Sequence, residues 1–75
     1  MLFRSFFQKN LKYLRIKDNL SYRELEKLSG VTYSIIYNIE HFKIKDPSLS
    51  SVIKLSNAFN IDISTLLFTD LEEKE

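Results

Sequence analysis

The 75-residue sequence contains no cysteine and has only one glycine, one proline and one histidine. The lack of cysteine excludes disulfides, thiolate metal sites and cysteine nucleophiles, and it fits a reducing compartment. The single histidine, His41, provides neither a histidine cluster for a metal nor a Cys–His pair for catalysis. All-β domains of this size need several turns that contain glycine or proline, so the scarcity of both residues predicts a helical protein.

Long apolar runs and phosphate-binding loops are also absent. The longest apolar runs have two or three residues, too few to cross a membrane. Residues 1–7 lack the h-region and cleavage site of a signal peptide. One glycine does not build a phosphate loop, and the acidic residues at 70–75 lie in a tail without a pocket. We therefore expect a cytoplasmic bacterial protein that is not an enzyme and has no cofactor, no metal and no small-molecule ligand.

The length and charge point to one polarised domain. Because domains usually have about 100–200 residues, we expect a single domain over residues 1–75 with a thin core. The net charge is +1, but residues 1–45 carry nine basic and four acidic side chains, whereas residues 46–75 carry two basic and six acidic ones. A domain with this distribution can present a basic face to a polyanion.

Helical spacing of apolar residues predicts five helices, an all-α fold. The first helix should end near Asp18 and Asn19, and the fourth should begin after Pro47, which disfavours the α conformation at the residue before it. The expected inward-facing residues are, helix by helix, Phe3, Phe6, Phe7, Leu11 and Leu14; Leu25 and Leu28; Ile35, Ile36 and Ile39; Leu49, Val52, Ile53, Leu55, Ser56 and Phe59; and Ile63, Leu66, Leu67 and Leu71.

Residues 21–40 have the pattern of two short helices joined by a tight turn. Ser21, with Glu24 three residues later, predicts a capping box at the start of the first of these helices. Gly30 permits the left-handed backbone conformation that a steep turn needs, and Thr32 is the next N-cap candidate. Two short helices joined in this way form a helix-turn-helix.

The second helix of this unit has two chemically different sides. Val31, Ile36 and Ile39 should hold it against the preceding helix. The opposite side is polar and aromatic, and it has the dimensions and chemistry to enter a DNA major groove. This side comprises Tyr33, Ser34, Tyr37 and Asn38.

Motifs over most of the chain resemble one family. They lie between about residues 7 and 68 and comprise Leu11-Lys12-Tyr13-Leu14-Arg15, Leu20-Ser21, Leu25, Gly30-Val31-Thr32, Ile36, Ile39-Glu40, Pro47-Ser48, Leu55, Ala58-Phe59, Ile61-Asp62 and Leu66-Leu67. The sequence thus resembles the Cro and lambda-repressor-type, or XRE-like, helix-turn-helix family. The resemblance implies a compact five-helix repressor-like domain. It also implies sequence-specific binding to double-stranded DNA, usually as a homodimer on a near-palindromic operator, and a role as a phage- or bacterial-type transcriptional repressor.

The resemblance also implies roles for particular residues. Asn38 suits adenine, because a side-chain amide can pair with adenine N6 and N7. By resemblance, base contacts fall on Tyr33, Ser34, Tyr37 and Asn38; phosphate contacts fall on Ser21, Tyr22, Thr32, Lys43 and Lys45; a buried structural ion pair joins Arg15 to Glu40; and the dimer candidates are Ile61, Ile63 and Phe68.

Three departures from the family pattern stand out. Glu26 replaces a small alanine that usually lets the helices of the motif approach closely. His41-Phe42 stands where glycine is common, so the following loop must turn without it. Tyr22 and Tyr33 occupy positions where glutamine is frequent, which implies a different operator.

Two alternative functions use the same fold. The first is a protein-interaction module, such as an antitoxin or anti-repressor, which Glu26 and the modest net charge support. The second, within the DNA-binding class, is a controller protein of a restriction-modification system. Phe3 and Phe6 either extend the first helix over the core edge or form a dimerisation patch.

Overall fold

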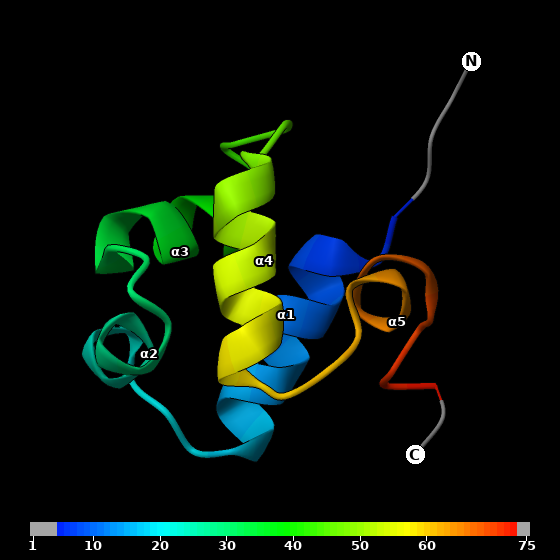
Figure 1. Ribbon diagram of the computed structural model, residues 1–75, viewed down its shortest axis with the longest axis horizontal. Coiled ribbons are helices and arrows are strands. Elements are labelled where there is room, and N and C mark those ends of the chain that lie inside the picture. The colour runs from blue at the N-terminus through cyan, green and yellow to red at the C-terminus, as the bar shows by residue number, and fades with distance from the viewer. Residues whose placement is uncertain (1–4, 74–75) are drawn as a thin grey trace.

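The computed structural model describes residues 5–73, which form five helices and no strand (Figure 1). The helices are α1 (Phe7–Lys17), α2 (Tyr22–Ser29), α3 (Tyr33–Glu40), α4 (Leu49–Ala58) and α5 (Ile63–Phe68). The expected all-α fold is therefore confirmed. Within the described residues, no helix has both the length and the apolar character needed to span a lipid bilayer.

The helix boundaries follow local hydrogen-bond chemistry. At the start of α2, the Ser21 hydroxyl accepts from the Glu24 backbone N–H (3.0 Å), and the Glu24 carboxylate accepts from the Ser21 N–H (2.8 Å), which confirms the capping box. Ser48 caps α4 in the same manner by accepting from the Ser51 N–H. Gly30 ends α2 in the left-handed conformation with φ of 82°. Thr32 is the N-cap residue of α3, as expected, but its side chain makes no capping hydrogen bond.

The helices surround a small apolar core. In Figure 1, α4 crosses in front of α1, with α2 and α3 on one side and α5 on the other. Each of the five helices contributes to the core, which contains Phe7, Leu11, Leu25, Val31, Ile36, Ile39, Val52, Leu55 and Leu66. This arrangement leaves one side of α2 and α3 facing solvent.

Some expected core positions are wrong. Leu28 is 60% exposed and Leu49 is 69% exposed, although both follow the helical spacing of their neighbours. Ile35 and Ile53 also lie near the surface, at 36% and 39% exposure. Spacing defines a stripe on each helix, but the neighbouring helices cover only part of that stripe. Phe3 lies outside the described residues, and Phe6 is half-buried.

A buried asparagine joins the first helix to the end of the last. Asn10 is fully buried, and its Nδ2 donates to the carbonyls of Leu66 and Thr69, both at 2.7 Å. Its Oδ1 accepts from the Leu71 backbone N–H at 3.1 Å. Nearby, Lys9 forms an ion pair with Asp70 (2.8 Å). These contacts hold the segment after α5 against α1.

Candidate nucleic-acid interface

The turn between α2 and α3 sets the direction of α3. The Gly30 N–H donates to the Glu26 carbonyl (2.8 Å), and the Val31 N–H donates to the Ser29 hydroxyl (3.1 Å). Val31 is buried in the core and anchors the end of the turn. The positive φ of Gly30 lets the chain change direction within two residues, which few other residue types allow without strain.

The two sides of α3 differ as expected. Ile36 and Ile39 are fully buried, whereas Tyr33 and Tyr37 are 43% and 40% exposed. Ser34 is also exposed, and Asn38 is partly exposed at the same side. We refer to Tyr33, Ser34, Tyr37 and Asn38 as the α3 face. It presents hydroxyl and amide groups beside aromatic rings on a helix that isoleucines hold in place.

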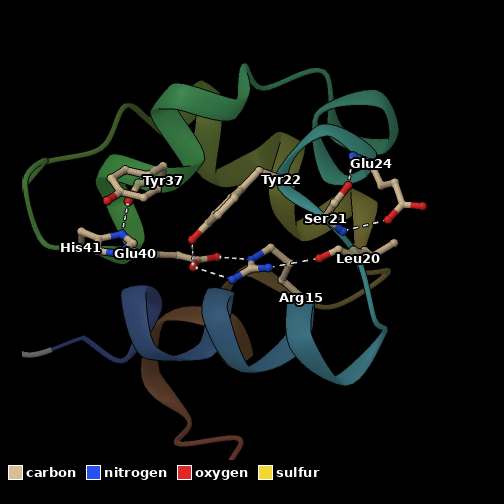
Figure 2. A network of polar contacts seen from close by, with 8 residues as sticks. All are labelled: Arg15, Leu20, Ser21, Tyr22, Glu24, Tyr37, Glu40 and His41. Atoms are coloured by element: carbon tan, nitrogen blue, oxygen red, sulfur yellow. Dashed lines mark hydrogen bonds and ion pairs between the residues drawn. The ribbon is translucent and has the colours of Figure 1, made fainter.

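Side chains outside α3 hold the two tyrosine rings. The Tyr37 ring stacks on His41, with centroids 3.9 Å apart, and the His41 Nδ1 lies 2.8 Å from the Tyr37 carbonyl oxygen (Figure 2). The Arg23 guanidinium lies 4.2 Å from the Tyr33 ring centroid. Neither supporting residue was predicted from the sequence. The i, i+4 spacing of Tyr37 and His41 was a usable signal, but the contact between Arg23 and Tyr33 depends on how α2 packs on α3.

A buried ion pair links α1 to the end of α3. The Arg15 Nε donates to Glu40 Oε2 (2.7 Å) and its Nη2 donates to Oε1 (3.0 Å), a two-point contact (Figure 2). The remaining Arg15 Nη1 donates to the Leu20 carbonyl (3.1 Å). The Glu40 side chain is fully buried, so its charge depends on this partner. The hydrogen bond to Glu40 raises the pKa of the Arg15 guanidinium, which stays protonated.

Tyr22 belongs to the same network. Its hydroxyl donates to Glu40 Oε1 (3.0 Å), and the Arg15 guanidinium lies 4.1 Å from its ring centroid. Burial, followed by the hydrogen bond to Glu40, raises the pKa of the Tyr22 hydroxyl. A phenol has one O–H donor, and here Glu40 accepts it. In this form of the protein Tyr22 therefore supports α3 instead of offering a donor to a phosphate.

The other expected phosphate contacts lie at the starts of two helices and in the loop after α3. Ser21 and Thr32 are exposed at the starts of α2 and α3. Lys43 and Lys45 are exposed in the loop after α3, and the Lys43 backbone N–H donates to the Asn38 carbonyl (2.8 Å). The Lys43 ammonium lies 5.7 Å from the Tyr37 ring centroid. The loop therefore begins directly beside the α3 face.

The fold accommodates two of the departures from the family pattern, Glu26 and the loop without glycine. Glu26 is partly buried, so an acidic side chain is accommodated where the family has alanine. After α3, Phe42 itself adopts the left-handed conformation with φ of 61° and turns the chain without glycine. Its ring is 64% exposed.

Among the dimer candidates, Phe68 is 51% exposed, whereas Ile61 and Ile63 are partly buried against the core.

The described residues contain no cluster of side chains that could bind a metal ion. Across residues 5–73, no three histidine, cysteine, aspartate or glutamate side chains gather as metal ligands would. The chemistry of the α3 face is that of hydrogen bonding and aromatic contact, with cationic side chains at its rim.

Comparisons with known proteins agree with this geometry. The helix-turn-helix family model matches residues 11–66. The N-terminal DNA-binding domain of SinR from Bacillus subtilis is 26% identical and superposes with a TM-score of 0.75, over 81% of this chain and 88% of that one. The restriction-modification controller protein C.AhdI from Aeromonas hydrophila is 32% identical with a TM-score of 0.73, over 80% and 89%. No curated protein sequence gives a significant match. The protein belongs to the XRE-like helix-turn-helix family of DNA-binding regulators.

Proposed function

We propose that the protein is a sequence-specific transcriptional regulator that inserts α3 into the major groove of double-stranded DNA. The observation that carries this proposal is the division of α3 into a fully buried isoleucine side and an exposed polar-aromatic side. Such a helix presents hydrogen-bonding groups outward while its axis is fixed by the core. Membership of the helix-turn-helix family supports the same function.

Within this proposal, base recognition comes from the α3 face, with Asn38 reading adenine. Ser21, Thr32, Lys43 and Lys45 contact phosphates on either side, because they lie at helix starts and in the adjoining loop. We assign Tyr22 the support of α3 through Glu40. Arg23 and His41 fix the orientations of Tyr33 and Tyr37.

Selection from random DNA duplexes tests the proposal. The full chain should enrich a palindrome whose half-sites lie about one helical turn apart, roughly 34–36 Å. Binding should weaken steeply with salt, with a log–log slope of about −0.9 for each neutralised phosphate. If no sequence is enriched at low salt, the DNA-binding proposal fails and a protein-interaction module on the same fold takes its place.

We also propose that the active form is a homodimer that pairs through the region of α5. Phe68 in α5 is exposed there, and Ile61 and Ile63, just before and at the start of α5, are partly exposed. A twofold dimer places two copies of α3 on one side of the assembly, which matches a palindromic operator. Sedimentation of the free chain measures this association.

A specific observation favours one subtype. The 32% identity to a restriction-modification controller protein supports a controller role as a second candidate beside a phage- or bacterial-type repressor. Genes for a restriction endonuclease and a methyltransferase next to the gene for this chain would favour the controller, and their absence would favour the repressor.

A further inference from the structure

The two arginines among the described residues are used in different ways. Arg15 donates from all three of its guanidinium nitrogens, to Glu40 and to the Leu20 carbonyl, and its side chain is only 12% exposed. Arg23, the second residue of α2, is exposed, and across residues 5–73 its side chain forms no hydrogen bond and no ion pair. Its guanidinium contacts the Tyr33 ring instead, with Cζ 4.2 Å from the ring centroid. The N–H donors of Arg23 therefore have no acceptor within these residues.

The Tyr33 ring holds the Arg23 guanidinium at the start of α3. A planar guanidinium packs well on the face of an aromatic ring, where the cation is attracted to the π electrons. Tyr33 is the first residue of α3. In a helix-turn-helix bound to DNA, the N-terminal residues of the second helix lie against base edges. Under the proposed function, Arg23 thus lies beside the end of α3 that meets the bases.

The packing of α2 on α3 does not depend on this contact. The buried side chains of Leu25, Val31 and Ile36 join the two helices in the core. Tyr33 is 43% exposed and Arg23 is also exposed, so both lie outside that core. A contact between two exposed side chains adds little to stability. Its main effect is to fix where the guanidinium lies.

The carboxylates of α2 leave Arg23 available to a ligand. The Glu24 carboxylate accepts from the Ser21 backbone N–H (2.8 Å), which holds it in the capping box. Glu26 is partly buried, and none of the ion pairs formed within residues 5–73 involves it or Arg23. A guanidinium presents its N–H groups in a fixed, planar fork. The fork of Arg23 can therefore bind a group that offers two acceptors side by side.

We propose that Arg23 is a further specificity-determining residue, which donates two hydrogen bonds to O6 and N7 of a guanine in the major groove. This assignment rests on the proposed function, and it adds a residue of α2 to the base contacts of the α3 face. The guanine lies next to the base pair that Tyr33 contacts. The Tyr33 ring restricts the long side chain before DNA binds, which lowers the entropy lost on binding.

Selection from random DNA duplexes with the parent and with Arg23→Lys tests this assignment. Lysine keeps the positive charge and favours a helix, but it has no planar fork. The parent should enrich a guanine at a fixed place in each half-site. Arg23→Lys should reduce the preference for that guanine by about 5- to 150-fold. Its affinity for unrelated duplexes should stay at the parent value, because the charge is retained.

Variants of Tyr33 test whether its ring positions Arg23. Tyr33→Leu removes the ring face and should lower the same guanine preference by about two- to fivefold, whereas Tyr33→Phe should leave it unchanged. In an Arg23→Ala background, Tyr33→Leu should have no further effect at this base pair. Lys27→Ala is the matched control, because it removes an exposed cation one turn later on α2 and should leave the guanine preference unchanged.

The outcomes separate this assignment from the proposed function. If the parent enriches an operator and Arg23→Lys enriches the same bases equally strongly, Arg23 does not read a base, and the proposed function stands. Uniform weakening of all duplexes by Arg23→Ala, with a salt slope smaller by about 1, would identify a phosphate contact and overturn the guanine assignment. If the parent enriches no sequence, the proposed function and this assignment fail together.

Discussion

Under the proposed function, the neighbouring residues Asn38 and Lys43 contribute differently to DNA recognition. The Lys43 N–H bonds to the Asn38 carbonyl, so the two residues are adjacent, but one side chain lies on the α3 face and the other at its rim. An amide can distinguish adenine from other bases, whereas an ammonium group contributes charge that any phosphate accepts. Proximity to DNA therefore does not by itself make a residue a determinant of specificity.

Substitution of these two residues should give different signatures. Asn38→Ala should reduce discrimination at one base pair of the selected operator by about 1–3 kcal/mol. Lys43→Ala should weaken all duplexes to a similar extent and reduce the magnitude of the salt slope by about 1. Fluorescence anisotropy with the operator and single-base variants, at several salt concentrations, measures both. Equal losses on every duplex for Asn38→Ala would remove it from the reading residues.

The buried pair of Arg15 and Glu40 should show strong coupling. Glu40→Leu alone should lower the free energy of unfolding by about 3–5 kcal/mol, because the Arg15 guanidinium would lose its charged partner. The Arg15 side chain is only 12% exposed, so water would not replace that partner. Arg15→Met together with Glu40→Leu should recover most of that loss, since no unpaired charge remains buried. Urea denaturation of the single and double variants measures the coupling. Additive losses would contradict a buried pair.

Residues whose contacts are local could be predicted from the sequence, and residues whose contacts depend on helix packing could not. Gly30, the Ser21–Glu24 capping box and the buried isoleucines of α3 are local patterns, and each was predictable because it depends on neighbours within four positions. The pairing of Arg15 with Glu40 came only from the family resemblance. Asn10 and the Arg23–Tyr33 contact were not predictable, because their partners are brought together by helix packing.

At the scale of the elements, the α2–α3 unit combines a capped start with a left-handed turn. The capping box fixes where α2 begins, and Gly30 fixes where it ends. Both features lie outside the core, so their effects on stability are separable from those of packing. They also determine the direction of α3 and hence, under the proposed function, how the α3 face would meet DNA.

Gly30→Ala should destabilise the protein by about 1–2 kcal/mol, the ordinary cost of a left-handed conformation for an L-residue. A Cβ at this position would meet nothing within 4 Å, so steric overlap adds no further penalty. Gly30→Asn should lose less, because asparagine tolerates this conformation better. Thermal unfolding measures both. Equal losses for alanine and asparagine would argue against a backbone origin.

The capping box should make α2 sensitive to acid. Hydrogen bonds from the Ser21 backbone and side chain lower the pKa of Glu24, so its ionised form is favoured in the folded state. This stabilisation is present above the unfolded pKa near 4.5 and is lost as pH falls through the lower folded value. The difference in melting temperature between the parent and Glu24→Gln should therefore shrink below about pH 4. A constant difference at all pH values would contradict the assignment.

At the scale of the whole molecule, the exposed apolar residues are spread over several helices. Leu28 on α2 and Phe68 on α5 are similarly exposed, at 60% and 51%, but only Phe68 lies in the proposed dimer region. Exposure alone does not distinguish an interface from ordinary surface. The two residues therefore form a matched pair for testing self-association.

Phe68→Gln should shift the chain toward monomer in sedimentation and weaken binding to the two-half-site operator. Leu28→Gln should leave both measurements at the parent values. Binding to an isolated half-site should be unaffected by either change, because the α3 face is intact in both variants. If Phe68→Gln sediments as the parent does, the dimer contact lies elsewhere.

The three hydrogen bonds that the Asn10 side chain makes with residues 66–71 limit when the protein can complete its core during synthesis. Its partners Leu66, Thr69 and Leu71 lie 56 to 61 residues further along the chain. Ribosomes add about 5–20 residues per second, so the buried amide waits roughly 3–12 s for the groups that satisfy it. Until then the contacts of α1 with α5 and the segment after it cannot form, although Arg15 can already pair with Glu40 of α3. The nascent chain therefore completes its core only after α5 has left the ribosome, and a product stalled before α5 leaves the Asn10 amide without these partners.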